Sequence, residues 1–403
     1  MNPFAITPET ITREIQEFNS RLAQGLDTLG RIGDVSVGTS PKDEVYREDK
    51  IVLYRYRPRT ERQNPVPMLI VYALVNRPYM ADLEDGRSLI QALLDQGLDV
   101  YLVDWGYPDD ADRHLTLDDY INGYLDRCVD AIRKQRSVAR IDLLGICQGG
   151  TFSLCYTALH QEKVRNLITT VTPVDFHTRR DLLSHLARHV DADLCVEAFG
   201  NLPGEVLNWT FLALKPFELM VRKYLDLVDI LDDAGKAANF MRMEKWIFDS
   251  PDQAGEAWRQ FIRQFYQENR LVKGSVMIGE RNVDLESVTV PVLNIYARDD
   301  HLVPPDSSRA LAGCIGSRDY QEIEFPGGHI GVYVSGKSRQ MLPSGQNLAP
   351  AVDFHSRQIS QHERGGRGLS VVVHQHQTSF GPGFIHKNSC RLDGLRRSQL
   401  PSG

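Results

Sequence analysis

Cys147 has the sequence surroundings that nucleophilic catalysis requires. It stands in the run Gly145-Ile-Cys-Gln-Gly-Gly150, directly after the apolar segment Ile141–Leu144 and before a segment of helical character. A nucleophile on such a strand–turn–helix elbow adopts a strained backbone conformation, and the flanking glycines leave room where strand and helix approach. The N-terminus of the following helix favours a thiolate, and the backbone N–H of Gln148 can face a developing oxyanion. The sequence therefore predicts Cys147 as a nucleophile.

A candidate acid and a candidate base follow this cysteine in the chain. Asp300 ends an apolar run that begins at Val290, and the carboxyl ends of strands are where α/β sheets bind ligands. His329 follows a short apolar segment and a Gly-Gly turn. Taken alone, Asp300 could be a helix cap and His329 a surface loop residue. The order Cys147, Asp300, His329 is nevertheless the order of nucleophile, acid and base in hydrolase folds, and it predicts a catalytic triad.

Two further positions near these residues are candidates for the site. The second oxyanion donor is expected from the turn after the strand Met68–Leu74, as the backbone N–H of Val75 or Asn76. His301 is interpreted either as a residue that supports the triad or contacts a substrate hydroxyl, or as an ordinary loop histidine. We expect no metal, because the six cysteines lack CxxC spacing and the twelve histidines lack a zinc pattern.

The elements that must position these residues alternate between strands and helices. Compact apolar runs, typical of strands buried on both faces, occupy residues 68–74, 99–104, 141–144, 167–172 and 290–296. The run 51–56 suits an outer strand, and helices are expected near 7–22, 87–96 and 117–136. Alternation without internal repeats predicts an α/β-hydrolase fold with a mostly parallel, doubly wound sheet.

The rhythm changes after residue 175, which divides the chain into four parts. Residues 1–175 form the first part of the core, 176–285 a mostly helical insertion, 286–334 the second part of the core, and 335–403 an atypical tail. The insertion carries many large aromatic residues, so it is either a helical bundle or a cap over an active site. The tail is rich in Ser, Gln, Gly and Pro and is expected to be disordered.

Charge and hydropathy exclude several classes of protein. The chain carries 46 Lys and Arg against 53 Asp and Glu, a net charge of −7; the tail holds +6 of this and the rest −13. An acidic body argues against a nucleic-acid partner, because phosphate neutralisation requires an excess of basic residues. The longest apolar run, Met68–Val75, is far too short to span a bilayer, and no secretory signal is recognised. A cytoplasmic location is expected.

At these residues the chain resembles the polyhydroxyalkanoate synthases, most closely the catalytic subunit, PhaC, of the class III (two-subunit) enzymes. Five segments carry the resemblance: LIVYALVNRPYMADL, DVYLVDWGYPDDADRHLTLDDYI, LLGICQGG, VLNIYARDDHLVPP and FPGGHIGVYVSGK. They spread over residues 1–337, and the family's cysteine, aspartate and histidine fall on Cys147, Asp300 and His329. Residues 338–403 depart from the family's pattern, and we interpret them as the product of a shifted reading frame or a fusion.

The resemblance implies a function and partners. An enzyme of this family polymerises (R)-3-hydroxyacyl-CoA, here 3-hydroxybutyryl-CoA, into a growing polyester chain with release of coenzyme A. It implies no cofactor, a second non-catalytic subunit (PhaE), homo- and hetero-oligomers, and location at polyester granules. A cysteine suits this chemistry independently, because acyl exchange between thioesters is nearly isoenergetic and transfer to a hydroxyl is then downhill. The alternatives are a cysteine α/β-hydrolase, similar to dienelactone hydrolases or thioesterases, and a non-catalytic granule scaffold.

Overall fold

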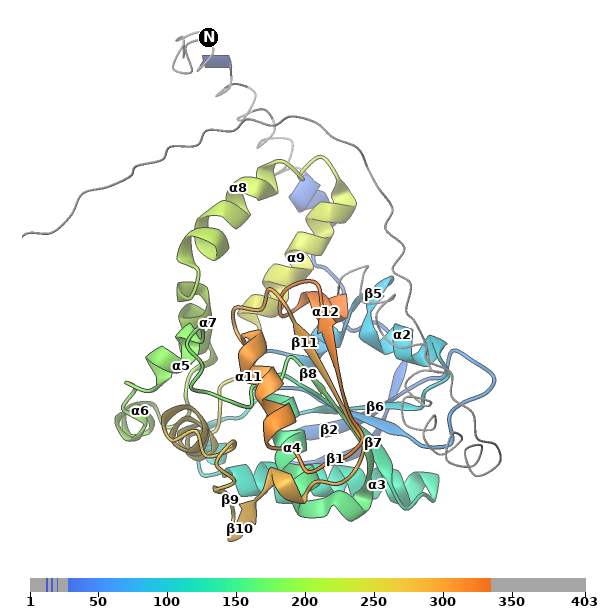
Figure 1. Cartoon of the computed structure of the whole chain (residues 1–403). Coiled ribbons are helices and arrows are strands. Elements are labelled where there is room, and N and C mark those ends of the chain that lie inside the picture. The colour runs from blue at the N-terminus through green and yellow to red at the C-terminus, as the bar shows by residue number, and fades with distance from the viewer. Residues whose placement is uncertain (1–11, 14–15, 17–19, 21–27, 335–403) are drawn as a thin grey trace, which may run out of the picture. The chain divides into compact units, whose positions relative to one another are not determined.

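The computed structural model describes residues 12–13, 16, 20 and 28–334 of the chain (Figure 1). All of them belong to the first of two units into which the chain divides, Met1–His355. The tail predicted over 335–403 and most of the helix predicted near 7–22 lie outside the described residues.

The described residues form an eight-stranded sheet in the order β1-β2-β6-β3-β7-β8-β11-β12. All neighbouring strands from β6 to β12 run parallel, whereas β2 is antiparallel to both of its neighbours. The strands are β1 (Lys42–Glu48), β2 (Ile51–Tyr56), β3 (Met68–Val71), β6 (Val100–Asp104), β7 (Ile141–Ile146), β8 (Val164–Thr170), β11 (Val292–Ala297) and β12 (Tyr320–Phe325). The predicted α/β architecture with a mostly parallel sheet is confirmed.

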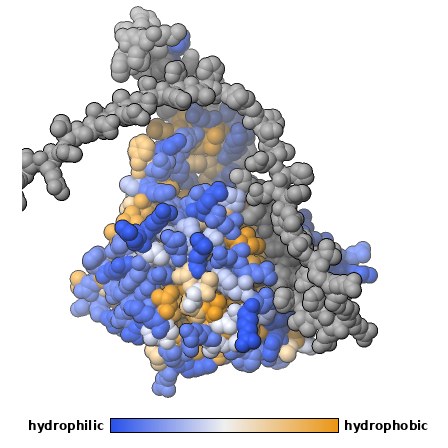
Figure 2. Space-filling model, in the orientation of Figure 1, coloured by the Kyte–Doolittle hydropathy of each residue, from blue (hydrophilic) through white to orange (hydrophobic). Residues whose placement is uncertain are grey.

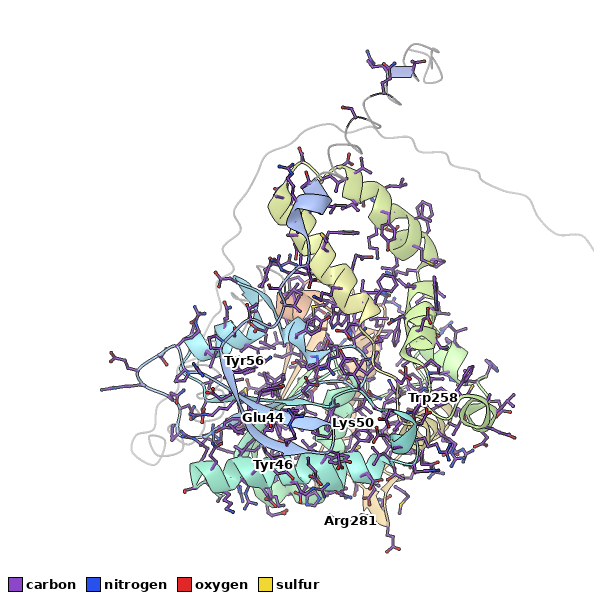
Figure 3. All side chains as sticks on the ribbon, turned by 180° about the vertical axis from the view of Figure 1, so that it is seen from behind. Glu44, Tyr46, Lys50, Tyr56, Trp258 and Arg281 are labelled. Atoms are coloured by element: carbon purple, nitrogen blue, oxygen red, sulfur yellow. The ribbon has the colours of Figure 1, made fainter. Side chains whose placement is uncertain are left out.

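The edge of the sheet corrects one prediction. The strand predicted as an outer strand, Ile51–Tyr56, lies inside the sheet, because β1 pairs with it and forms the edge. Figure 3 labels Glu44 and Tyr46 on this edge strand and Tyr56 at the end of its neighbour. β1 escaped the sequence analysis because its residues, KDEVYRE, are mostly polar and none of them is fully buried. Charged side chains on an edge strand discourage pairing with another chain.

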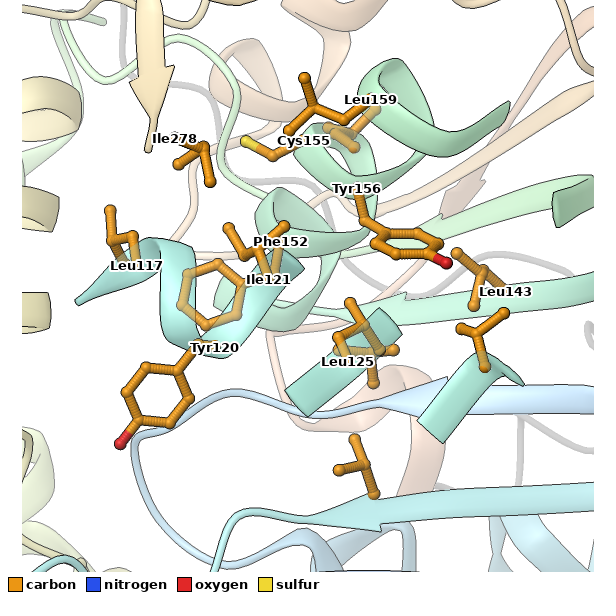
Figure 4. Packing of buried hydrophobic residues seen from close by; sticks show 14 of the residues in the cluster. Leu117, Tyr120, Ile121, Leu125, Leu143, Phe152, Cys155, Tyr156, Leu159 and Ile278 are labelled. Atoms are coloured by element: carbon orange, nitrogen blue, oxygen red, sulfur yellow. The ribbon is translucent and has the colours of Figure 1, made fainter. Parts of the chain in front are cut away.

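Side-chain alternation along the strands builds two cores, one on each face of the sheet. On β3, Leu69 and Val71 belong to one core, and Met68 and Ile70 to the other. The first core is closed by α3 (Asp126–Arg136), α4 (Gln148–His160) and the π-helical turn Asp119–Leu125. Figure 4 shows Phe152 and Tyr156 of α4 packed in this core. The second is closed by α2 (Leu89–Asp95) and α12 (Gly331–Val334).

Between β8 and β11 the chain is mostly helical, and we call residues 176–285 the cap. Its helices are α5 (Leu182–Ala187), α6 (Ala192–Phe199), α7 (Gly204–Ala213), α8 (Lys223–Val228), α9 (Ala234–Phe248) and α10 (Gly255–Phe261). A short hairpin of β9 (Val276–Ile278) and β10 (Arg281–Val283) ends the segment. The sequence analysis, which predicted a mostly helical insertion, did not include this hairpin. α11 (Pro305–Arg309) then follows β11.

The cap exposes most of the large apolar side chains found on the described surface. Twelve of the fourteen exposed large hydrophobic residues lie between Leu182 and Phe248, and Phe217 is the most exposed at 63%. Figure 2 shows hydrophobic side chains on the helices that rise above the sheet around α8. Many exposed apolar side chains on one segment indicate a site of interaction. Among the described helices, none combines the length and apolar character that crossing a membrane requires.

Candidate active site

Cys147 occupies the sharp turn between β7 and α4. Its backbone has φ 54° and ψ −125°, a conformation that non-glycine residues rarely adopt. The cysteine N–H donates to the Thr170 carbonyl at 2.9 Å, and its own carbonyl accepts from the Gly150 N–H at 2.9 Å. The thiol side chain is partly exposed at the N-terminus of a 13-residue helix. A strained turn that presents a thiol at a helix N-terminus is the arrangement that activates a nucleophile.

The glycines of the elbow are required by close packing. A Cβ on Gly149 would lie 2.2 Å from the Val71 carbonyl oxygen, and one on Gly150 would lie 1.8 Å from Thr172 Oγ1. A Cβ on Gly145 would lie 2.4 Å from the Gly150 Cα. Only a chain without side chains at these positions lets α4 begin directly against the ends of β3 and β8.

Asp300 follows β11 and is buried, and both of its carboxylate oxygens are engaged. Oδ1 accepts from the backbone N–H groups of Leu302 and Val303, each at 2.9 Å. Oδ2 accepts from His329 Nδ1 at 2.7 Å. The carboxylate is therefore fixed by its own loop and directed at the histidine.

His329, which follows β12, joins the aspartate to the cysteine. It is only 7% exposed and interacts with the thiol of Cys147 as well as with Asp300. Burial disfavours a charged imidazole, but the Asp300 carboxylate and the Cys147 sulfur outweigh it and raise the pKa of His329 to about 10. The structure thus brings together the three residues proposed as a triad.

His301 is close to this pair but half-buried. Burial lowers its pKa; Lys215 and His329 lower it further, whereas Asp300 raises it. Its side chain forms no hydrogen bond with Asp300 or His329 in the described part of the chain. It therefore borders the site without belonging to the hydrogen-bonded set.

The candidate oxyanion donors lie on two neighbouring segments. In the turn after β3, the Leu74 N–H donates to Gln148 Oε1 at 3.0 Å. The N–H groups of Val75, Asn76 and Gln148 donate to no acceptor among the described residues, so they remain available. The N–H of Gln148 is free because the first residues of a helix lack intrahelical partners. The side chain of Asn76 points elsewhere, to the cap, through its Nδ2.

Several residues around the thiol were missed by the sequence analysis. Tyr72, Tyr266 and Tyr333 each interact electrostatically with Cys147, and burial raises the pKa of each phenol above its ordinary value. Tyr72 directly follows β3, and Tyr333 lies four residues after His329. Tyr72 lies close in sequence to the oxyanion turn and Tyr333 close to His329, which was a usable signal, but no spacing rule identifies either residue.

Val171, also missed, adds strain beside the nucleophile. It has φ 45°, is fully buried, and donates its N–H to the Ile295 carbonyl at 2.7 Å. A β-branched residue in this region is a backbone outlier, and such strain gathers at functional sites. Because β-branched residues favour strands, the sequence pointed to continued strand at this position.

Within residues 28–334, no group of three His, Cys, Asp or Glu side chains is placed as ligands of a metal ion would be. The chemistry that the site offers is nucleophilic: a thiol, a base within reach of it, an acid fixed behind the base, and free N–H groups nearby.

Comparisons with known proteins identify the fold and the family of the chain. The model of the alpha/beta hydrolase fold family matches residues 66–335, which confirms the predicted fold class. A second family model, described as the N-terminus of poly-beta-hydroxybutyrate polymerase (PhaC), matches residues 9–93.

Several curated relatives carry the name poly(3-hydroxyalkanoate) polymerase subunit PhaC. The protein from Allochromatium vinosum is 60% identical over 342 residues, which cover 84% of this chain and 96% of the relative. The protein from Thiocystis violacea is 56% identical, with coverages of 84% and 96%. The protein from Synechocystis is 55% identical, with coverages of 82% and 90%.

Proposed function

Because the chain belongs to the poly(3-hydroxyalkanoate) polymerase PhaC family, we propose that it joins 3-hydroxyacyl groups from coenzyme A thioesters into a polyester. As a member of this family it is a polymerising acyltransferase. The observation that supports the chemistry best is the continuous connection from Asp300 through His329 to Cys147.

In the first half-reaction, Cys147 Sγ attacks the thioester carbonyl. The thiol proton passes to His329, the carbon–sulfur bond to coenzyme A breaks, and the departing thiolate takes the proton from His329. The new thioester keeps the acyl group activated at nearly unchanged free energy. The N–H groups of Gln148 and of Val75 or Asn76 stabilise the intermediate oxyanion.

In the second half-reaction, a 3-hydroxyl group attacks the acyl carbonyl on Cys147. His329 accepts the hydroxyl proton, an oxoester forms, and the cysteine sulfur is released. Asp300 acts through His329 rather than on the hydroxyl, because each of its oxygens already accepts hydrogen bonds. The cap limits hydrolysis by excluding water from the acyl-enzyme.

Finer features follow from family membership and are part of the proposal. The substrate is (R)-3-hydroxybutyryl-CoA, no cofactor is required, and a second subunit, PhaE, completes a class III enzyme. The enzyme acts at the surface of polyester granules, where the exposed apolar residues of the cap face the product.

The test measures release of coenzyme A from (R)-3-hydroxybutyryl-CoA, followed by sizing of the product, with and without the partner subunit. Cys147→Ala should abolish release, whereas Cys195→Ala, at a partly exposed cap cysteine, should not. High-mass polyester establishes the polymerase. Free 3-hydroxybutyrate alone indicates a hydrolase, and no release from the wild type with its partner leaves a scaffold.

A further inference from the structure

The segment that carries two candidate oxyanion donors is held from two sides. It comprises Leu74, Val75 and Asn76, between β3 and the short helical turn Pro78–Ala81. On the side of the elbow, Gln148 Oε1 accepts the Leu74 N–H at 3.0 Å. This bond engages the first N–H of the segment and leaves the next two free.

On the opposite side, the side chain of Asn76 binds the end of helix α9 in the cap. Its Nδ2 lies 3.2 Å from the Trp246 carbonyl, 3.3 Å from the Ile247 carbonyl and 2.7 Å from Ser250 Oγ. Carbonyls in the last turn of a helix lack the usual partners four residues on. The Trp246 carbonyl accepts from the Asp249 N–H, and the Asn76 amide adds a second donor at this helix end. A reciprocal bond runs from Trp246 Nε1 to the Arg77 carbonyl at 2.9 Å.

The connection extends further into the cap. Ser250 Oγ donates to Asn208 Oδ1 of α7 at 2.7 Å, and Asn208 is only 6% exposed. Beside it, the Asp249 carboxylate accepts from the hydroxyls of Tyr79 and Tyr107 at 3.0 and 2.7 Å. Hydrogen bonds therefore connect the end of α9 to the core next to the segment Leu74–Asn76.

The backbone of Asn76 depends on the same residue type. Its φ is 56°, in the left-handed region where asparagine is tolerated better than most residues. This φ sets the orientation of the Asn76 N–H relative to its own Cα, and the side-chain bonds to the end of α9 hold that Cα in place.

We propose that Asn76 is a positioning residue that couples the position of cap helix α9 to the candidate oxyanion donors Val75 and Asn76. Acyl transfer is then fast only when the end of α9 is seated on the segment. A displacement of the cap that breaks the Asn76 bonds releases the donors. The inference rests on the proposed acyl transfer through Cys147.

The test variant is Asn76→Gly, because glycine accepts the left-handed backbone and removes the side chain that binds α9. The matched control is Asn269→Gly. Asn269 also has a positive φ, 51°, and its side chain bonds Asp175 and the Phe176 N–H away from the oxyanion segment. Ser250→Ala is a milder second variant that deletes the shortest bond of Asn76 and leaves residue 76 intact.

Two reactions of Cys147 are measured in each variant. Acylation by (R)-3-hydroxybutyryl-CoA or by p-nitrophenyl acetate passes through an oxyanion, whereas alkylation by iodoacetamide forms none. We expect Asn76→Gly to slow acylation ~10- to 100-fold and Ser250→Ala to slow it less, both with alkylation changed by less than about twofold. Asn269→Gly should leave the ratio of the two rates at the wild-type value.

Three outcomes overturn the inference. They are unchanged acylation in Asn76→Gly, an equal loss of acylation and alkylation there, and the same selective loss in Asn269→Gly. Failure of the proposed function gives a different result. The wild type would then react with p-nitrophenyl acetate but release no coenzyme A from the thioester, and the ester rates would still decide the role of Asn76.

Discussion

At Asp300, the direction of each hydrogen bond determines what the acid does. Two backbone N–H groups hold Oδ1, so only Oδ2 is left for His329, and with an ionised carboxylate the proton stays on Nδ1. In the neutral ring the other nitrogen is then an acceptor that faces the Cys147 thiol, and a proton taken there is held strongly because Asp300 and Cys147 raise the pKa of His329 to about 10. The fixed loop thus selects the tautomer that can take the cysteine proton.

Asp300→Asn should therefore reverse the tautomer without disturbing the packing. The asparagine Oδ1 would keep the N–H groups of Leu302 and Val303, which turns its NH₂ group toward His329 and moves the ring proton to Nε2. We expect the acylation rate to fall ~10³- to 10⁴-fold, and thermal stability at neutral pH to fall as well, because Asp300 no longer raises the pKa of His329. Near-normal turnover in this variant would show that Asp300 does not act through His329.

The raised pKa of His329 also predicts how stability depends on pH. The folded protein holds this proton up to about pH 10, whereas an unfolded histidine loses it near 6.5. The stabilisation is thus complete below about pH 6.5 and is lost as the pH rises toward 10. We therefore compare the melting temperatures of Cys147→Ala and Cys147→Ala/His329→Gln. The advantage of the variant that keeps His329 should shrink as the pH rises over this range. The shared Cys147→Ala change removes the thiol's own titration and also its part in raising the pKa of His329, so Asp300 alone holds the proton and the loss is complete at a lower pH than in the wild type. A difference independent of pH would contradict the prediction.

At the scale of elements, the elbow is a contact between three strands and one helix. α4 begins so close to the ends of β3 and β8 that a Cβ on Gly149 would meet backbone atoms, whereas one on Gly150 would meet the side chain of Thr172. A backbone neighbour cannot be removed by substitution, but the side chain of Thr172 can. A second substitution that removes the clashing neighbour should therefore restore stability to a Gly150 variant but not to a Gly149 variant.

Gly149→Ala and Gly150→Ala should each destabilise the protein by ~3 kcal/mol, because the new methyl group overpacks the elbow. Adding Thr172→Ala should restore part of the stability of Gly150→Ala, since the 1.8 Å contact is with Thr172 Oγ1. It should not restore Gly149→Ala, whose neighbour is the Val71 carbonyl. Urea unfolding of the single and double variants measures both effects, and equal rescue would show that the elbow adjusts as a unit.

The parts of the fold and site predicted from sequence are those with a local signature. Buried parallel strands are continuous apolar runs, and Cys147 and His329 stand next to glycines that a sharp turn requires. The bonds of Asn76 to α9 could not be predicted, because the partners are 170 to 174 residues away. β1 was missed because an edge strand needs no apolar alternation when its partner supplies the pairing.

At the scale of the described molecule, the core and the cap treat their apolar residues differently. The sheet buries its apolar residues in two cores, whereas the cap leaves Trp209, Phe217 and Leu225 more than half exposed. Exposing such side chains to water costs free energy, so a lasting apolar surface indicates a use. The proposed product, an uncharged polyester, presents a surface that these side chains can cover without desolvating any charge.

Phe217→Gln/Leu225→Gln should therefore weaken attachment to poly(3-hydroxybutyrate) granules. Both side chains are exposed, at 63% and 56%, so their replacement should leave the melting temperature nearly unchanged. Burial of one such side chain contributes ~2 kcal/mol, so we expect the affinity for granules, measured by co-sedimentation, to fall at least ~10-fold. Met277→Gln, at an exposed apolar residue of the β9–β10 hairpin, is the control and should bind as the wild type does. Equal loss in the control would mean that general surface hydropathy, rather than the cap, holds the protein on the polymer.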